Sequence, residues 1–309
     1  MCNDHQRSSP LALAPTITRV PLARISQPSR WSRRRLLVNA GLGTASMAIF
    51  AACGSTADNA SSTTTSSTPA TPTEPNAGAG ETTAAPEVEE SEAAQAGTTE
   101  AEQAAPAEPE AAPSGELQLQ HVNLGFVSAY VLVRGSEVAI VDTGVAGSGP
   151  AINDAITMMG LMPSDVRHIV LTHNHADHSG GLGDLEGAMT NATVHAGPGD
   201  VDSIRTSLAL NEVADGDEVF GMGIVGTPGH TTGSISVFDT DTGLLVAGDA
   251  INGDGSGGLL GANPSFTEDM DAANASVARM AALSPMIAAF GHGGAPVTED
   301  VTAKLAAIA

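Results

Sequence analysis

The sequence predicts a layered α/β domain over residues 116–309, and three observations support this fold class. Short apolar runs typical of buried strands recur along the segment. Stretches with apolar residues at helical spacing lie between these runs. Histidines and carboxylates directly follow several of the expected strands, where side chains from separate strands can meet at one edge. The segment has 194 residues, enough for a single domain with one core.

The sequence of the first half of this domain predicts four strands and one helix. Strands are expected at residues 117–122, 126–133, 138–141 and 168–171. Ile152, Ile156 and Met159 recur at helical spacing and predict a helix over residues 150–159, which Gly160 would end. The strand at 168–171 leads directly into a segment rich in histidine.

The second half predicts more strands and two helices. Strands are expected at residues 192–195, 223–226, 234–238, 244–247 and 286–290. Thr267 is the expected N-cap of a helix. The inward face of that helix has Met270, Ala273, Val277 and Met280. Residues 298–308 are expected to form a closing helix.

The N-terminal segment has the features of an export signal. Ser32-Arg33-Arg34-Arg35-Leu36-Leu37 opens a weakly apolar run that ends in Phe50-Ala51-Ala52-Cys53. This resembles a twin-arginine signal with a lipoprotein cleavage box. We therefore expect residues 1–52 to be a signal peptide and the protein to be exported and held outside the cytoplasm by a lipid on Cys53. A plain cleaved signal is the alternative. The apolar run covers residues 36–52, which are 17 residues, whereas a membrane-spanning helix needs roughly 20 apolar residues.

The segment that follows the signal is poor in large apolar residues. Residues 53–115 consist mainly of Ser, Thr, Ala, Pro, Gly and Glu. Such a composition cannot bury enough apolar surface to offset the entropy of ordering the backbone. We expect these residues to form a disordered tether between the anchor and the domain.

Charge and cysteine content restrict the partners and the chemistry. From Glu116 onward, 23 acidic residues stand against 5 basic ones, a formal charge of 5 − 23 = −18. Nucleic acids and anionic membranes are poor partners for such a domain, so membrane contact is expected only through the lipid on Cys53. The chain has only Cys2 and Cys53, both outside the domain, so a metal site there must use histidines and carboxylates.

The segment after residue 171 has the spacing of a metal site. His173 and His175 lie two residues apart in extended chain, so both side chains can point to one ion. Asp177 and His178 begin a turn and can address a second ion. Two ions about 3.5–4 Å apart can share a hydroxide, which is nucleophilic near neutral pH.

Three more candidate ligands follow later strands. They are His230 in Pro228-Gly229-His230-Thr231, Asp249 in Gly248-Asp249 and His292 in Gly291-His292-Gly293. A single histidine after a strand is more often a structural hydrogen-bonding residue, but seven such residues in this order favour a joint metal site. Structural roles are expected for the other four histidines, His5, His121, His168 and His195, although His195 is also placed to line a pocket.

This series of residues resembles the metallo-β-lactamase superfamily, which also has the Asp142-Thr143-Gly144 strand end and the turn at residues 229–234. The resemblance implies a single-domain, four-layer αββα sandwich with metals at one edge. It also implies ligand sets: His173, His175 and His230 for the first metal, and Asp177, His178 and His292 for the second. Asp249 would bridge the two metals, and Asp177 would have a catalytic role by orienting the nucleophile.

Within the superfamily, the residues favour the glyoxalase II and lactonase branch. Asp249 stands where thiolate-type zinc β-lactamases have cysteine. The chain ends soon after His292, without the helical extension with which glyoxalase II binds glutathione, so lactones and other esters are favoured over glutathione thioesters. We expect an exported hydrolase that opens an ester, lactone or thioester of a small molecule. Its metals would be two divalent ions, with zinc expected and iron or manganese as alternatives. The oligomeric state stays open.

Two other functions remain as alternatives. A persulfide dioxygenase of the same superfamily would hold a single iron through His173, His230 and Asp249. A surface lipoprotein that binds metal without catalysis is the second. For the hydrolase, residues 250–266 are expected to form a mobile, glycine-rich loop that selects the substrate, and a simple flexible connection is the alternative. Tyr130 is a candidate proton donor, and Asn252 is a candidate oxyanion donor.

Overall fold

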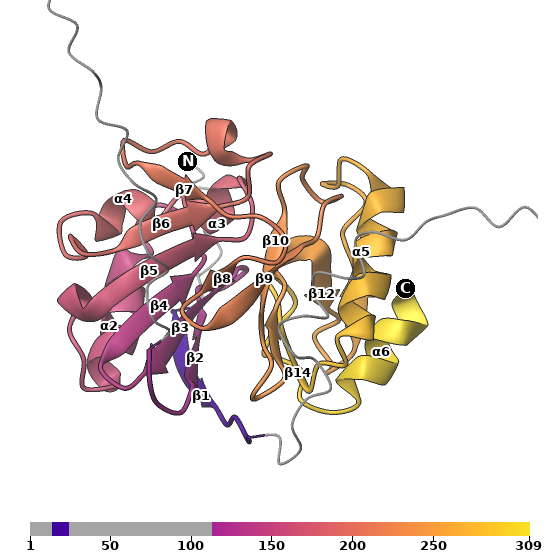
Figure 1. Cartoon of the computed structure of the whole chain (residues 1–309), viewed down its shortest axis with the longest axis horizontal. Helices are drawn as coiled ribbons and strands as arrows, with labels where there is room; N and C mark the ends of the chain where they lie inside the picture. Colours follow the sequence, from indigo (N-terminus) through magenta and orange to yellow (C-terminus); the bar gives the residue numbers. More distant parts are fainter. Residues whose placement is uncertain (1–13, 25–112) are drawn as a thin grey trace, which may run out of the picture. The chain divides into compact units, whose positions relative to one another are not determined.

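Two β-sheets pack between two layers of helices in this computed structural model (Figure 1). It describes residues 14–24 and 113–309, all of which belong to one compact unit. The twin-arginine motif, Cys53 and nearly all of the expected tether lie outside the described residues.

The first sheet has seven strands in sequence order. They are β1 (Thr16–Val20), β2 (Gln118–Asn123), β3 (Ser128–Arg134), β4 (Glu137–Val141), β5 (Val166–Leu171), β6 (Thr193–Ala196) and β7 (Leu210–Glu212). Pairing is antiparallel from β1 to β4 and parallel from β4 to β7. The carboxyl ends of β4, β5 and β6 therefore lie at one edge.

The second sheet has five strands in the order β14-β11-β10-β9-β8. They are β8 (Glu218–Val219), β9 (Met222–Gly226), β10 (Ile235–Asp239), β11 (Leu244–Val246) and β14 (Ile287–Ala289). β10 is antiparallel to both of its neighbours, and β11 is parallel to β14. Strands β9, β11 and β14 thus run in one direction. A separate hairpin joins β12 (Ile251–Gly253) to β13 (Leu259–Gly261).

The helices are α2 (Gly149–Met158), α3 (Ala176–Ser179), α4 (Leu182–Leu185), α5 (Met270–Ala282) and α6 (Val301–Ile308). Helices α2 and α4 cover the outer face of the first sheet, and α5 and α6 cover that of the second, whereas the single turn α3 lies after β5 (Figure 1). Short 3₁₀ turns occur at Pro163–Asp165, Val201–Ser203 and Gly248–Ala250. Within the described ranges, no helix is long and apolar enough to cross a membrane.

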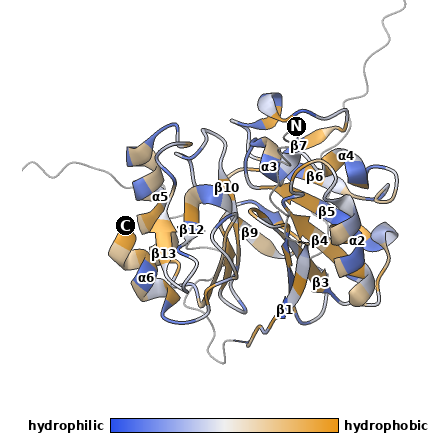
Figure 2. Ribbon diagram, turned by 180° about the vertical axis from the view of Figure 1, so that it is seen from behind, coloured by the Kyte–Doolittle hydropathy of each residue, from blue (hydrophilic) through white to orange (hydrophobic). Residues whose placement is uncertain are grey.

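Three clusters of buried apolar residues match the layers. One combines residues of both sheets, such as Leu132 and Ile224, and so fills the space between them. A second joins the first sheet to α2 and α4, and a third joins the second sheet to α5 and α6. In Figure 2 the strands of the first sheet are largely coloured as apolar, while the helices show both apolar and polar residues. This confirms the layered α/β prediction.

Strand β1 lies within the segment that the sequence predicts as a signal peptide. It pairs antiparallel with β2, from Thr16 opposite Asn123 to Val20 opposite Leu119. Val20 is buried in the cluster between the sheets, and Arg19 donates a hydrogen bond of 2.7 Å to Gln118. In the unprocessed chain, β1 is therefore the edge strand of the first sheet, although it lies about a hundred residues before its partner β2.

One local prediction, the N-cap of α5, is wrong. The N-cap of α5 is Asp269, whose carboxylate accepts a hydrogen bond of 2.9 Å from the backbone of Ala272. Thr267 instead donates to the carbonyl of Asn263, which leaves its oxygen facing His230. Within residues 250–266, residues 251–261 form the β12–β13 hairpin, and the expected mobility of this segment stays a prediction.

Two buried histidines outside the candidate site make stability depend on pH. Burial lowers the pKa of His121 from 6.5 to about 4. Burial also lowers the pKa of His195 to about 4, and His168 adds to this effect. Between pH 6.5 and 4 the unfolded chain therefore binds more protons than the folded chain. The free energy of unfolding should fall through this window as the pH drops, by up to about 3 kcal/mol for each histidine.

Urea unfolding at pH 7 and at pH 4.5 would measure this loss. In His121→Gln the side chain does not titrate, so the variant should lose less stability over the same pH interval than the unaltered chain. An identical loss in both proteins would contradict the assignment.

Candidate metal centre

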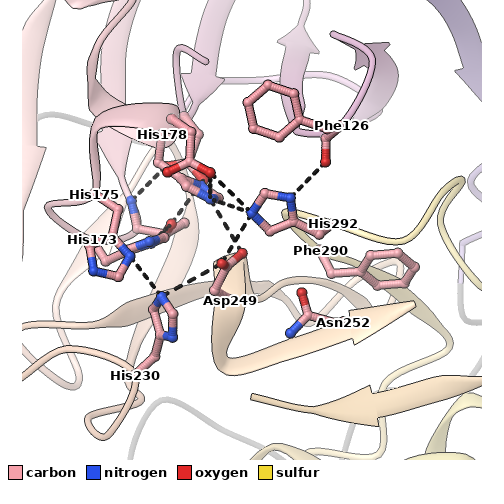
Figure 3. A network of polar contacts seen from close by, with 12 residues as sticks. Phe126, His173, His175, His178, His230, Asp249, Asn252, Phe290 and His292 are labelled. Atoms are coloured by element: carbon pink, nitrogen blue, oxygen red, sulfur yellow. Dashed lines mark hydrogen bonds and ion pairs between the residues drawn. The ribbon is translucent and has the colours of Figure 1, made fainter. Parts of the chain in front are cut away.

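Four chain segments bring the candidate ligands to one edge of the sandwich, and each segment follows a strand (Figure 3). The residues after β5, including those of α3, provide four ligands: His173, His175, Asp177 and His178. His230 follows β9, Asp249 lies in the 3₁₀ turn after β11, and His292 follows β14. Because β9, β11 and β14 run in one direction, their carboxyl ends meet at the same edge.

The structure brings all seven predicted residues together. Their ligand atoms form three overlapping groups, each within 4.8 Å: His173, His175 and His230; His173, His178 and Asp249; and Asp177, His178 and His292. The first and third groups coincide with the two ligand sets that the resemblance implies. The assignment of individual residues to metals stays a prediction.

Asp249 lies between the first and third groups. Its carboxylate oxygens are 3.3 Å from Nε2 of His178, 3.2 Å from Nε2 of His292 and 3.6 Å from Nε2 of His230. The side chain is 9% exposed, so water does not compete strongly for its oxygens. This placement fits a carboxylate that bridges two ions.

Hydrogen bonds fix the rings of four histidines from outside. Nδ1 of His292 donates to the backbone carbonyl of Phe126 at 2.6 Å, and Nδ1 of His178 donates to Asp142 at 2.8 Å. Nδ1 of His230 lies 3.2 Å from the Thr267 hydroxyl, which itself donates to a carbonyl. When Nδ1 carries the proton, Nε2 presents a lone pair to the centre of the site.

The fourth ring, His173, is held through a relay. The Thr172 hydroxyl donates to Asp142 at 2.8 Å, so it accepts the Nδ1 proton of His173 at 3.1 Å. Asp142 also accepts from the backbone of Thr172. Within the described ranges, Asp142 is one of four non-glycine residues with a positive φ, here 61°. This uncommon backbone conformation aims one carboxylate at both His178 and Thr172.

Asp142→Asn should weaken metal binding about 10–100-fold, the usual effect of losing an outer hydrogen-bonding partner of a ligand. The asparagine amide would meet at least one donor among Thr172 and His178, because all three contacts to Asp142 are donors. Competition with a chromophoric chelator measures the affinity. Asp241→Asn, at an exposed position, is the control. Equal affinities in the two variants would contradict this role for Asp142.

The charges of the site are balanced by protons when no metal is present. Burial would lower the pKa of His178, but the charge of Asp142 and hydrogen bonds with Asp142 and Asp249 outweigh it and raise the pKa to about 10. Burial would also lower the pKa of His292. Hydrogen bonds with Asp177 and Asp249 outweigh this effect and raise the pKa of His292 to about 10. The hydrogen bond from His292 in turn lowers the pKa of Asp177.

Among the described residues, Nε2 of His173 is buried and has no hydrogen-bond partner. Oδ1 of Asp249 is also buried, and its contact with Nε2 of His178 is long, at 3.3 Å. Burial strongly lowers the pKa of His173, so its Nε2 keeps a free lone pair rather than a proton. Buried polar groups are rarely left unsatisfied. Neutral imidazoles and carboxylates are the ligands that zinc prefers, and the donor set therefore fits divalent metal ions.

Several residues that support the site were not predicted. Thr172, Thr267 and the backbone carbonyl of Phe126 hold ligand rings. Asp200 accepts hydrogen bonds from the two loops that carry His173, His175 and His230. Asp200 follows β6 at the same sheet edge, so its position after an expected strand could have indicated a role near the site. The role of the Phe126 carbonyl could not be read from the sequence, because every residue has a backbone carbonyl.

Three other candidates have structural roles. The Tyr130 hydroxyl donates to the carbonyl of Phe290 and accepts from its amide, and burial raises the Tyr130 pKa, so this residue is not available as a proton donor. Asn252 donates to the carbonyl of Gly261 within the hairpin. His195 bonds His168 at 3.1 Å and Asn211 at 3.1 Å.

Fold and site together define a metal-binding αββα domain, and comparisons with known proteins agree. Residues 122–292 match the model of the Metallo-beta-lactamase superfamily. The chain is 30% identical over 196 residues to the uncharacterized protein YobT of Bacillus subtilis, covering 54% of this chain and 83% of that protein. It is 33% identical over 139 residues to hydroxyacylglutathione hydrolase of Dechloromonas aromatica, covering 44% and 48%. The chain thus spans about half the length of that hydrolase.

A solved structure shows the same fold. The Rm3 metallo-beta-lactamase superimposes with a TM-score of 0.50 at 19% identity, over 64% of this chain and 91% of that protein. The family match covers more than half of the chain. This chain belongs to the metallo-β-lactamase superfamily, and its αββα fold is confirmed.

Proposed function

We propose that the protein is a two-metal hydrolase that opens ester, lactone or thioester bonds of small molecules, with zinc as the expected metal. The observation that carries the proposal is the placement of Asp249 between two histidine-rich ligand groups. His173, His175 and His230 would hold one ion, and Asp177, His178 and His292 the other. Two bound divalent ions would supply a nucleophilic water at neutral pH and polarise the substrate carbonyl.

The residues of the chain would position that reaction. Asp177 is 29% exposed and so reaches solvent, and its lowered pKa keeps it ionised at neutral pH. It can therefore orient the attacking water and accept a proton from it. The outer hydrogen bonds to Asp142, Phe126 and Thr267 keep the rings from turning during the reaction.

The surroundings of the site favour uncharged substrates. The ring of Phe126 is 62% exposed and stacks beside His292, with the ring centres 6.1 Å apart. It offers an apolar surface next to the reacting centre. The formal charge of −18 from residue 116 onward repels anions such as glutathione conjugates. Lactones and neutral esters therefore fit better than the substrate named for the hydroxyacylglutathione hydrolases.

A substrate panel would test the proposal on the zinc-loaded chain. Lactones, aryl esters, thioesters and β-lactams should be assayed, with a chelator-stripped sample as control. We expect hydrolysis of at least one lactone or ester, lost on chelation and restored by zinc. One iron per chain with oxygen uptake on persulfide would instead favour the dioxygenase. Stoichiometric metal binding with no turnover on any of these substrates would favour the non-enzymatic alternative.

We also propose that the protein is exported and anchored by a lipid on Cys53. The support is the sequence Arg33-Arg34-Arg35 before an apolar run that ends at this cysteine. Cleavage before Cys53 would separate β1 from the domain, so the mature sheet would begin at β2. Replacing Arg33 and Arg34 by lysine should stop export, and Cys53→Ala should release the protein from the membrane fraction. Unchanged export of the lysine variant would contradict the twin-arginine signal.

A further inference from the structure

Asp200 is a buried carboxylate that no ligand set includes. It lies after β6 and is 1% exposed. Four hydrogen-bond donors surround it. One oxygen accepts from the side chain of Asn174 at 3.1 Å and the backbone of Gly233 at 2.9 Å. The other accepts from the backbone of Asn174 at 2.9 Å and the hydroxyl of Thr231 at 2.6 Å.

These donors are sequence neighbours of one ligand group. Asn174 stands between His173 and His175, and Thr231 follows His230 directly. Asp200 therefore links the loop after β5 to the turn after β9, the two segments that carry the first ligand group. Nε2 of His230 and Nδ1 of His175, which belong to these two segments, lie 3.0 Å apart.

Close backbone packing strengthens this link. A Cβ atom on Gly233 would collide with the backbone nitrogen and side chain of Asp200. A Cβ atom on Gly197 would collide with the carbonyl of Gly233. The segment after β6 and the turn after β9 thus touch through their main chains, which leaves Asp200 little freedom to move.

We propose that Asp200 is a positioning residue that sets the spacing of His173, His175 and His230 and thereby the affinity of the first metal. Asp142, in contrast, bonds a ligand of the second group, His178, directly. Asp142 also holds His173 of the first group through the Thr172 hydroxyl, whereas the four hydrogen bonds of Asp200 all come from the segments that carry the first group. The inference rests on the proposed two-metal centre, but not on any substrate, because zinc affinity is its readout.

The chemistry requires a carboxylate at this position. All four partners of Asp200 are donors. In Asp200→Asn the amide nitrogen would face two of these donors and could accept from neither. The loop after β5 and the turn after β9 would then lose their fixed spacing, while the hydrogen bonds of His178 and His292 would remain.

Zinc affinity in two backgrounds tests the proposal. The His292→Ala variant retains the first ligand group. In this background, adding Asp200→Asn should weaken zinc binding by about 10–100-fold.

The His230→Ala variant retains the second ligand group. In that background, adding Asp200→Asn should alter the zinc affinity less than about threefold. Equal losses in both backgrounds, or no loss in the first, would overturn the proposal. If the chain without these changes binds no zinc, the proposed function itself fails.

Two further variants separate positioning from folding. Asp239 is also a buried carboxylate, with Arg134 and Thr242 as partners. Asp239→Asn should lower thermal stability without changing zinc affinity in either background. Thr231→Val removes only one donor to Asp200 and keeps the side-chain volume. If Asp200→Asn does not fold, Thr231→Val should still weaken zinc binding selectively in the His292→Ala background, and unchanged affinity would overturn the proposal.

Discussion

Replacing Asp249 by alanine should abolish hydrolysis and reduce metal affinity by more than about 100-fold, beyond the usual cost of losing an outer-shell partner. The carboxylate of Asp249 is within 3.6 Å of nitrogens from His178, His230 and His292. These three histidines come from both ligand groups, so Asp249 contacts both groups. Its loss would also leave the protonated His178 and His292 of the metal-free chain without their shared counter-ion.

Metal content by mass spectrometry and turnover on the best substrate would measure this effect. Asp241→Ala is the matched control, because that carboxylate is exposed. An Asp249→Ala protein that keeps two metals and full activity would rule out the bridging role.

Gly291→Ala should also inactivate the protein, although only one methyl group is added. A Cβ atom at Gly291 would collide with Oδ1 of Asp249 and with the ring of His178. The backbone amide and carbonyl of Gly291 bond to Gly248 and Ser128, so the chain cannot easily move away. The methyl group would displace two candidate ligands at once. We expect activity to fall at least about 100-fold, together with metal affinity.

Gly261→Ala is the control for this substitution. It lies in the hairpin that follows Asp249, but a Cβ atom there meets nothing within 4 Å. Activity and metal content in this variant should stay unchanged. If Gly291→Ala binds two metals with unchanged affinity, the ligand geometry described above is wrong.

The long strands and helices could be predicted because burial repeats along them. β3 is buried at every position, and its apolar run from 126 to 133 shows this in the sequence. By contrast, β8 has only two residues, and β12 and β13 have three each. Such strands are too short for a periodic pattern. β1 was missed because its partner β2 lies about a hundred residues away, and nothing local shows this pairing.

The ligands could be predicted because few residue types bind metals and all seven follow strands. Their supports could be predicted only in part. The hydroxyl of Thr267 was assigned to a helix cap, since threonine favours both roles and only the packing of His230 decides between them. The carbonyl of Phe126, which holds His292, would be present with any residue at that position.

Anomalous X-ray scattering from crystals of the zinc-loaded chain tests the central claim most directly. We expect two peaks about 3.5–4 Å apart. One should lie among His173, His175 and His230, the other among Asp177, His178 and His292, with Asp249 touching both. A single peak, or a second peak outside these groups, would contradict a two-metal centre.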